Sequence, residues 1–217
     1  MIARFLSAAA VAALFAVPAA HAADVYAGVG TTGFLLGVEH HYSDSVGVRA
    51  DVSGGSLSRD ANTSDATYHG TAHLAALGLF ADYHPWGGAF RLSAGALIGD
   101  THLDGNAVAT ANGTFTINGV QVSAPGESLT ARVRLPSVRP FIGLGWGHAP
   151  KDSGVFGQFD LGLAYGRPDV TLTATPNLAA AAAAAGTSVE SERILLQNKA
   201  NDFRLYPVLR VGVGYGW

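Results

Sequence analysis

The strongest constraint on this chain is the alternation in its last residues, Pro207 to Trp217. One parity of this segment is apolar or aromatic and consists of Leu209, Val211, Val213, Tyr215 and Trp217. The other parity carries Arg210 and glycines. Successive side chains on a β-strand point to opposite faces, so the segment predicts a strand with one apolar face and one small or polar face.

The same two-faced pattern recurs earlier in the chain, over 46–53, 77–83, 90–99, 139–147 and 158–166. A soluble protein could turn the apolar face of one such strand inward. A closed sheet that is apolar all round its outside explains so many of them most simply. The chain also ends on an aromatic residue, as the last strand of an outer-membrane barrel does when its end lies in the interfacial aromatic girdle.

The N-terminus has the three parts of a secretory signal peptide. Arg4 gives a positive start, the run from Phe5 to Val17 is mostly apolar, and Ala20-His21-Ala22 is a small-x-small cleavage site. The apolar run is shorter than the roughly 20 residues that span a bilayer as a helix. We therefore expect residues 1–22 to be removed and residues 23–217 to form one domain beyond the inner membrane of a Gram-negative bacterium.

Composition excludes several kinds of site. The chain has no cysteine, which excludes disulfides, a thiol nucleophile and cysteine metal ligands. Its formal net charge of −3 argues against a nucleic-acid partner. Gly is abundant, at 28 residues, and only 13% of residues are charged, which suits many strands around a crowded barrel interior.

The segments and their connections predict an all-β fold, an eight-stranded antiparallel up-and-down transmembrane β-barrel. The expected strands are 24–30, 34–42, 45–58, 66–83, 89–104, 130–147, 154–173 and 205–217. Short connections at 42–45, 84–88 and 149–153 are expected to be periplasmic turns, and long ones at 57–66, 104–129 and 175–204 extracellular loops. The alternative is one bulged strand from Asp24 to Tyr42, which leaves an odd number of strands and an open seam.

Two of the long loops are expected to have structure of their own. Asn118-Gly119 lies between alternating residues over 114–122 and predicts a hairpin with a type I′ turn. In the last loop, Thr187 and Glu190 have capping-box spacing before a short helix to about Ala200. The alanine run from Ala179 to Ala185 is expected to add a helical turn that ends at Gly186.

The chain resembles the carbapenem-associated outer-membrane protein family, which is also described as ornithine-uptake porins. The stretches that carry the resemblance are Val29–Gly33, His84–Gly87, Pro140–Gly145, Gly154–Gly157, Pro168–Thr173 and Pro207–Trp217. The resemblance implies a narrow outer-membrane channel for small solutes such as basic amino acids. It also implies that barrel-assembly machinery recognises the terminal aromatic residues. Oligomeric state is left open, with a monomer as the expected state.

If the apolar parity faces lipid, the other parity lines the lumen with balanced charges. This expected lumen charge network is Glu39, Arg49, Asp51, Asp82, Arg91, Arg139, Asp160 and Arg210. Asp82 and Arg91 flank the 84–88 turn and are expected to pair across strands. The network predicts a salt-bridged plug, because an eight-stranded barrel is only just wide enough for side chains to fill. The other interpretation is a gated path whose acidic residues attract a cationic solute.

The remaining site residues are the interfacial aromatics and the assembly signal, expected at Tyr83, Trp146, Tyr215 and Trp217.

No metal site, cofactor site or catalytic site is expected. The histidines are scattered, with His69 and His73 too far apart along a strand to share one metal ion. His41-Tyr42-Ser43 has the His-x-Ser spacing of lipid A deacylases, but it falls at an expected periplasmic turn, whereas that activity works on the outer leaflet. The function that competes with solute transport is that of a non-transporting structural or surface-interaction barrel with a salt-bridged, plugged lumen.

Overall fold

The computed structural model describes residues 23–63, 66–110, 113–147 and 153–217. The expected signal peptide and most of the 149–153 turn lie outside these residues. No helix of the described part is long and apolar enough to cross a membrane.

Eight strands form a closed ring in which every neighbouring pair is antiparallel. In ring order they are β1 (Ala23–Gly30), β2 (Gly33–Ser43), β3 (Val46–Asn62), β4 (Ala66–Tyr83), β5 (Phe90–Ile98), β10 (Val138–Trp146), β11 (Gly154–Tyr165) and β13 (Leu205–Gly216). β1 pairs with β2 on one edge and with β13 on the other, which closes the ring. The short first strand is therefore separate, and the alternative of one bulged strand with an open seam is wrong.

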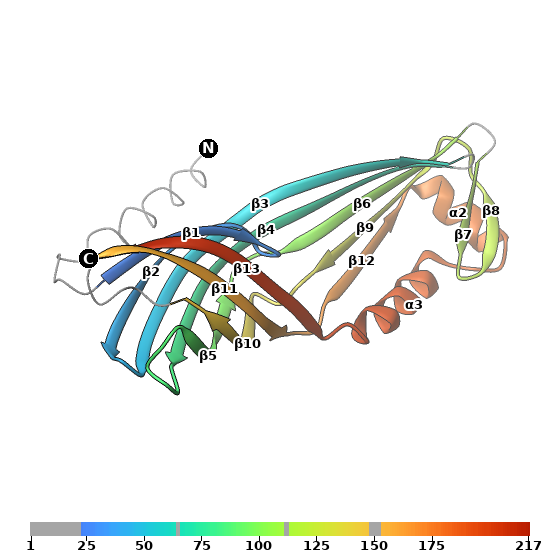
Figure 1. The fold of residues 1–217 in the computed structure, drawn as a ribbon. Coiled ribbons are helices and arrows are strands. Elements are labelled where there is room, and N and C mark those ends of the chain that lie inside the picture. Colours follow the sequence, from blue (N-terminus) through green and yellow to red (C-terminus); the bar gives the residue numbers. More distant parts are fainter. Residues whose placement is uncertain (1–22, 64–65, 111–112, 148–152) are drawn as a thin grey trace, which may run out of the picture.

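The ring has two distinct ends. At one, the turn end, short connections join β2 to β3 and β4 to β5, and the last residues of β13 pair with β1. At the other, the loop end, the sheet continues beyond the ring as an extension (Figure 1). The extension consists of the distal parts of β3 and β4 with β6 (His102–Ala109), β9 (Ser128–Arg134) and β12 (Asp169–Ala174).

The extension corrects three expected strands and one expected loop. The segments 89–104, 130–147 and 154–173 are not continuous, because 99–101, 135–137 and 166–168 interrupt them. Two of the interruptions contain Pro136 and Pro168, which lack the backbone N–H that a sheet needs. The expected loop 57–66 is largely strand, since β3 runs to Asn62 and β4 begins at Ala66.

Strand register is kept through the first two interruptions. Leu77 pairs with Ile98 in the ring, and His73 pairs with His102 in the extension, so β5 and β6 lie against β4 in one register. The faces are therefore continuous from ring to extension, although the polarity of the side chains on them is not.

In the ring, the outward face is apolar. The exposed large side chains include Val48, Leu79, Leu92, Ile142, Leu161, Leu163, Leu209, Val211 and Val213. On the extension the same face carries Asp104 with Arg132 and Asp100 with Arg134. The outward row of five strands thus changes from apolar to charged at the level of the interruptions.

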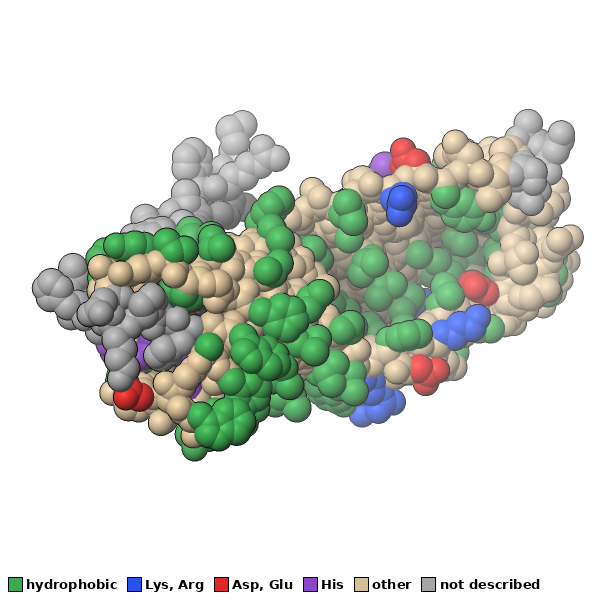
Figure 2. All heavy atoms as spheres, viewed as in Figure 1, with side chains coloured by type: hydrophobic (Ala, Val, Ile, Leu, Met, Phe, Trp, Pro, Cys, Tyr) green, Lys and Arg blue, Asp and Glu red, His purple; other side chains and the backbone are tan. Residues whose placement is uncertain are grey.

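The inward face changes in the opposite sense. In the ring it carries the buried charges, whereas on the extension one row across five strands consists of Leu57, Ala72, Leu103, Val133 and Val170. Figure 2 shows this part of the molecule as a hollow with hydrophobic side chains on its floor. Leu57 and Leu103 are exposed there.

The far end of the hollow is covered by the loops. The hairpin of β7 (Thr114–Ile117) and β8 (Val120–Ser123) and the helix α2 (Pro176–Ala184) bury Phe115, Ile117 and Leu178 against Ala107 and Ala109. Asn118 and Gly119 have φ of 49° and 80°, as a type I′ turn requires, so the expected hairpin is confirmed.

The last loop contains two helices, α2 and α3 (Val189–Asn201). Gly186, with φ of 77°, follows α2 as expected. The cap of α3 is Ser188, whose side chain accepts from the Ser191 amide, so the expected Thr187–Glu190 box is wrong by one residue. Glu190 instead pairs with Arg193 at 2.7 Å, an ion pair that lowers the pKa of the Glu190 carboxyl.

Candidate functional site

The candidate site is the interior of the ring. All eight residues of the lumen charge network are buried there, with exposures from 0% for Glu39 to 4% for Arg210. They come from strands that are far apart in sequence, and the closed ring brings them together because each one points inward. A buried charge without a partner costs several kcal/mol, so the pairing among these residues decides what the interior can do.

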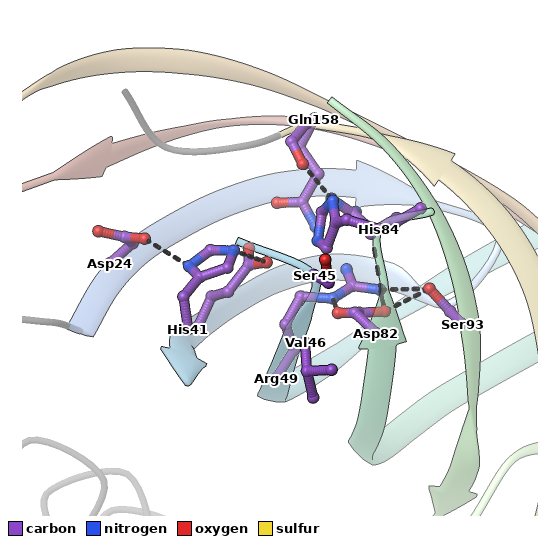
Figure 3. A network of polar contacts seen from close by, with 12 residues as sticks. Asp24, His41, Ser45, Val46, Arg49, Asp82, His84, Ser93 and Gln158 are labelled. Carbon is purple, nitrogen blue, oxygen red and sulfur yellow. Dashed lines mark hydrogen bonds and ion pairs between the residues drawn. The ribbon is translucent and has the colours of Figure 1, made fainter. Parts of the chain in front are cut away.

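Arg49 is the centre of the network. Its Nε donates to Asp82 Oδ2 at 2.5 Å, and its Nη1 donates to Asp160 Oδ2 at 3.0 Å. Its Nη2 lies within hydrogen-bond distance of both carboxylates and of Ser93. One guanidinium thus joins β3 to β4, where Figure 3 shows it beside Asp82, and to β11 on the far side of the ring.

Arg91 does not make the close pair with Asp82 that the sequence predicted. Asp82 lies opposite Ser93 in the register and accepts a hydrogen bond from its hydroxyl, whereas Arg91 Nε is 4.0 Å from Asp82. The close partner of Arg91 is Asp160, at 2.6 Å. The predicted Asp82–Arg91 pair is therefore present only as a long contact, because two residues that flank a turn need not be register partners when the turn is irregular.

Gln158 completes this part of the cluster. With its amide oxygen turned toward the guanidinium groups, it accepts from Arg49 Nη1 at 2.6 Å and from Arg91 Nη2 at 3.0 Å. We prefer this orientation because the opposite one places the amide nitrogen against two cationic donors.

A second group of charges lies beside the first. Arg210 Nη1 donates to Asp51 Oδ2 at 2.7 Å, and the Tyr26 hydroxyl donates to the same oxygen at 3.0 Å. The ring of Phe80 lies between the two groups, 5.1 Å from the Arg49 guanidinium carbon and 5.0 Å from that of Arg210. Cation–π contacts therefore add to the ion pairs.

Inward glycines make room for these side chains. A Cβ at Gly145 would lie 2.5 Å from Asp160 Oδ1 and 3.0 Å from Arg91 Nε. A Cβ at Gly162 would lie 2.4 Å from the ring of Phe141. Phe141 belongs to an apolar layer with Phe80, Leu97 and others that lies on the loop side of the charges. The interior is therefore filled by matched large and small residues.

Several buried polar atoms of the described interior accept or donate no hydrogen bond within the described part of the chain. They are both carboxylate oxygens of Glu39, Asp51 Oδ1, Arg91 Nε, Arg210 Nε and Nη2, Arg139 Nη1 and the Tyr206 hydroxyl. They run from Glu39 near the turn end to Arg139 and Tyr206 beyond the apolar layer. The network is thus densely paired around Arg49 and incompletely satisfied on both sides of it.

A histidine cluster lies at the turn end of the interior. His41, from β2, has Nδ1 3.4 Å from Asp24 Oδ2 and Nε2 3.2 Å from Glu39 Oε1 (Figure 3). His84, which follows β4, is fully buried, and its ring is 5.7 Å from that of His41. Sequence reasoning missed this cluster, although the shared parity of Glu39 and His41 was a signal that both point inward.

Three further histidines, His69, His73 and His102, lie on the outward face of the extension. His73 stacks on His102, and His69 pairs with Asp60. Asp104 lies near His102 and accepts from Arg132 at 2.5 Å, a hydrogen bond that lowers the pKa of the Asp104 carboxyl. These groups are in contact with solvent.

The expected interfacial aromatics lie at the turn end and are exposed: Tyr83, Trp146, Tyr215 and Trp217. Trp146 contacts Phe90 and Phe159, and Tyr215 contacts Trp217.

The side chains of His41 and Ser43 do not face each other as a catalytic pair would. His41 points to the carboxylates, and Ser43 Oγ accepts from the amides of Ser45 and Val46 in the turn.

Comparisons with known proteins give a match in structure alone. No family model matches this chain, and no curated protein matches its sequence. The crystal structure of Acinetobacter baumannii CarO2 matches with a TM-score of 0.63 at 24% identity, over 90% of this chain and 97% of that one. The structure of Acinetobacter baumannii CarO matches with a TM-score of 0.61 at 24% identity, over 91% and 97%. The neighbours are thus the proteins that the sequence resemblance pointed to, and the chain has the CarO fold.

Proposed function

We propose that this protein is an outer-membrane β-barrel that provides a narrow path for small solutes, among them basic amino acids. The observation that carries this proposal is the row of incompletely satisfied polar atoms along the interior, from Glu39 to Arg139 and Tyr206. A buried polar group without a hydrogen bond costs about 1–3 kcal/mol. Polar groups that served only to plug the interior would be expected to form hydrogen bonds with one another. Polar groups along a solute path instead form and exchange hydrogen bonds with water and with the solute.

The membrane location is supported by the height of the apolar outward band. On β13 the outward row runs from Leu205 to Tyr215. Ten residues at about 3.3 Å each give roughly 33 Å along the strand, or about 25 Å across a bilayer at a tilt of about 40°. This is the height of the apolar band of outer-membrane barrels. In the proposed orientation the turn end is periplasmic, the extension is extracellular, and residues 1–22 are removed on export.

The charge order along the interior suits a solute that carries both signs. Arg139 and Tyr206 can donate to a carboxylate at the loop end, and Glu39 can accept from an ammonium group nearer the turn end. The Arg49 cluster lies between these groups and closes the interior in the conformation described. Passage then requires Arg49 or Arg91 to change partners, so we expect transport to be slow.

A second function is favoured by the Arg49 cluster itself. Because Asp82 and Asp160 are both held by Arg49, the cluster can act as a fixed plug in a barrel that transports nothing. The extension and its helices would then carry the function through contacts outside the cell.

Uptake of labelled ornithine into liposomes that contain the purified protein separates these functions, with planar-bilayer conductance as a second measurement. We expect uptake above that of empty liposomes, a several-fold loss in Arg139→Met with Tyr206→Phe, and no loss in Arg59→Met. Arg59 is an exposed arginine in the part of β3 that belongs to the extension, outside the ring, and is the matched control. If uptake and current are no greater than in empty membranes, the transport proposal is wrong and the plugged, non-transporting barrel is the function that remains.

Fractionation of cells tests the location independently. We expect the protein in the outer-membrane fraction, without residues 1–22, and with electrophoretic mobility that changes on heating. Recovery in the soluble periplasmic fraction with no such change would contradict the barrel proposal.

A further inference from the structure

The histidine cluster at the turn end brings three possible metal ligands together. One ligand atom from each of Glu39, His41 and His84 lies within 4.8 Å of the other two. We propose that these three side chains bind a Zn²⁺ ion inside the turn end of the ring. This inference does not depend on transport, since it rests on the geometry of the three side chains and their neighbours.

Glu39 provides the first argument. It is 0% exposed, and neither of its carboxylate oxygens accepts a hydrogen bond from a described residue. His41 Nε2 nevertheless lies 3.2 Å from Glu39 Oε1, without the geometry of a hydrogen bond. A buried carboxylate needs a positive partner, and an ion held by Glu39 and the two histidines would supply it.

The neighbours of the two histidines provide the second argument. His41 Nδ1 lies 3.4 Å from the Asp24 carboxylate, and His84 Nδ1 lies 2.8 Å from the carbonyl oxygen of Gly88. Histidines that bind a metal through one nitrogen almost always donate the other N–H to a carboxylate or a backbone carbonyl. Both rings have such a partner at Nδ1, which would make Nε2 the ligand atom of each.

The ligand set favours zinc over the hard cations. Two imidazoles and one carboxylate, with no sulfur, are a ligand set of three-ligand zinc sites that keep a fourth position for water. Ca²⁺ and Mg²⁺ prefer oxygen ligands only. Ligand atoms around a tetrahedral zinc ion at about 2.1 Å are roughly 3.4 Å apart. The side chains therefore move together by up to about an ångström on binding.

The position of the site indicates what the ion would do. Glu39 and His41 are on β2 and His84 follows β4, so the ion would join two strands of the ring at its turn end, with β1 held through the contact of Asp24 with His41. The bound ion would close that end of the interior and resist separation of the strands there.

The competing arrangement has no metal. His41 would then be a doubly protonated imidazolium between Asp24 and Glu39, and His84 would be a buried structural residue. Metal binding and its dependence on Glu39 and His84 distinguish the two arrangements, because an imidazolium binds no zinc.

The test is a Zn²⁺ titration of the protein, purified in detergent without a polyhistidine tag and stripped with a chelator. Calorimetry should give one tight equivalent at neutral pH. Glu39→Gln and His84→Gln should each weaken it by more than about 100-fold, and the neighbour variant Asp24→Asn by about 10- to 100-fold. The control is the double variant His73→Gln with His102→Gln, which removes the outward histidine pair and should keep the tight equivalent.

If one tightly bound zinc ion is lost in the control variant but kept in Glu39→Gln, zinc binds on the outward face and the proposal is overturned. The absence of any tight zinc binding would overturn it as well. A measurement on the unaltered protein guards against variants that fail to fold. Co²⁺ should give the visible absorption of a tetrahedral site, and Zn²⁺ should raise the temperature at which heat-modifiable mobility is lost. Failure of both in folded protein would leave the imidazolium arrangement.

Discussion

At the scale of single residues, Arg49 holds the interior together because its guanidinium is shared by two carboxylates from opposite sides of the ring. Arg91 is a second donor to Asp160. Parity alone predicted that all of these residues face inward. The choice of close partners depended on register and on the depth of each residue, so the sequence predicted the long Asp82–Arg91 contact and not the close one between Asp82 and Arg49.

Replacing Arg49 by Met should destabilise the folded protein by about 3–5 kcal/mol, because Asp82 and Asp160 lose their common cation in a buried site. Urea unfolding of the protein in detergent measures this. A double-mutant cycle should give strong coupling for Arg49 with Asp160 and weak coupling for Asp82 with Arg91, which are 4.0 Å apart at their closest ion-pair contact. Arg59→Met should change stability by less than about 0.5 kcal/mol. Equal coupling in the two cycles would contradict the assignment of Arg49 as the centre.

Gly162→Ala should destabilise by about 1–3 kcal/mol, because the new Cβ meets the ring of Phe141 and overpacks the interior. Gly157 is the matched control on the same strand, since nothing lies within 4 Å of a Cβ there. Unfolding midpoints of the two variants should therefore differ clearly. If Gly162→Ala is as stable as Gly157→Ala, the interior is not packed as described.

At the scale of elements, strands β3 and β4 each serve two environments. The apolar residues of each strand face outward in the ring and inward on the extension, so they change parity although the strand keeps the same inward and outward positions. The signal was present in the sequence, since the odd positions of β4 change from Leu79 and Leu77 to His73 and His69. Such a reversal is the pattern expected where a strand passes from an apolar environment to an aqueous one.

The helix α3 covers the edge of β12, where Gln197 accepts from the Val170 amide and donates to the Pro168 carbonyl. Ser188→Ala should lower the stability of this helix by about 1 kcal/mol, because the Ser191 amide loses its acceptor. Amide hydrogen exchange should become faster in the first turn of α3 and stay unchanged in the ring. The control is Thr187→Ala, which leaves the cap in place. Equal exchange in the two variants would argue against Ser188 as the cap.

At the scale of the whole molecule, the ring and the extension are stabilised in different ways. The ring has its polar groups inside and an apolar surface outside, which suits lipid around it. The extension has charged pairs on its outward face and an apolar inward face that the hairpin and α2 partly cover. One continuous sheet thus joins a ring with an apolar outer face to an extension with a charged outer face.

This division predicts that introducing an arginine on the outward face has a large effect in the ring and a small one on the extension. Val211→Arg places a charge in the middle of the apolar band and should cost about 2–4 kcal/mol on folding into lipid vesicles. Thr173→Arg places the same residue on the outward face of the extension, where Arg132 is already tolerated, and should cost little. The yield of heat-modifiable protein in vesicles measures both. Similar yields would mean that the ring is not surrounded by lipid.

The sequence by itself determined the two-faced strands, the even ring with its short first strand, and the type I′ hairpin. Each of these depends on local alternation or turn chemistry, which a chain carries in its own residues. The tertiary structure alone decided the interruptions that form the extension, the partners of Arg49 and Arg91, and the meeting of Glu39, His41 and His84. Those features depend on strand register and on distances across the closed ring, which join residues far apart in the chain. The alternation that ends at Trp217 therefore indicated which side chains enter the interior, and only closure of the ring determined which of them meet.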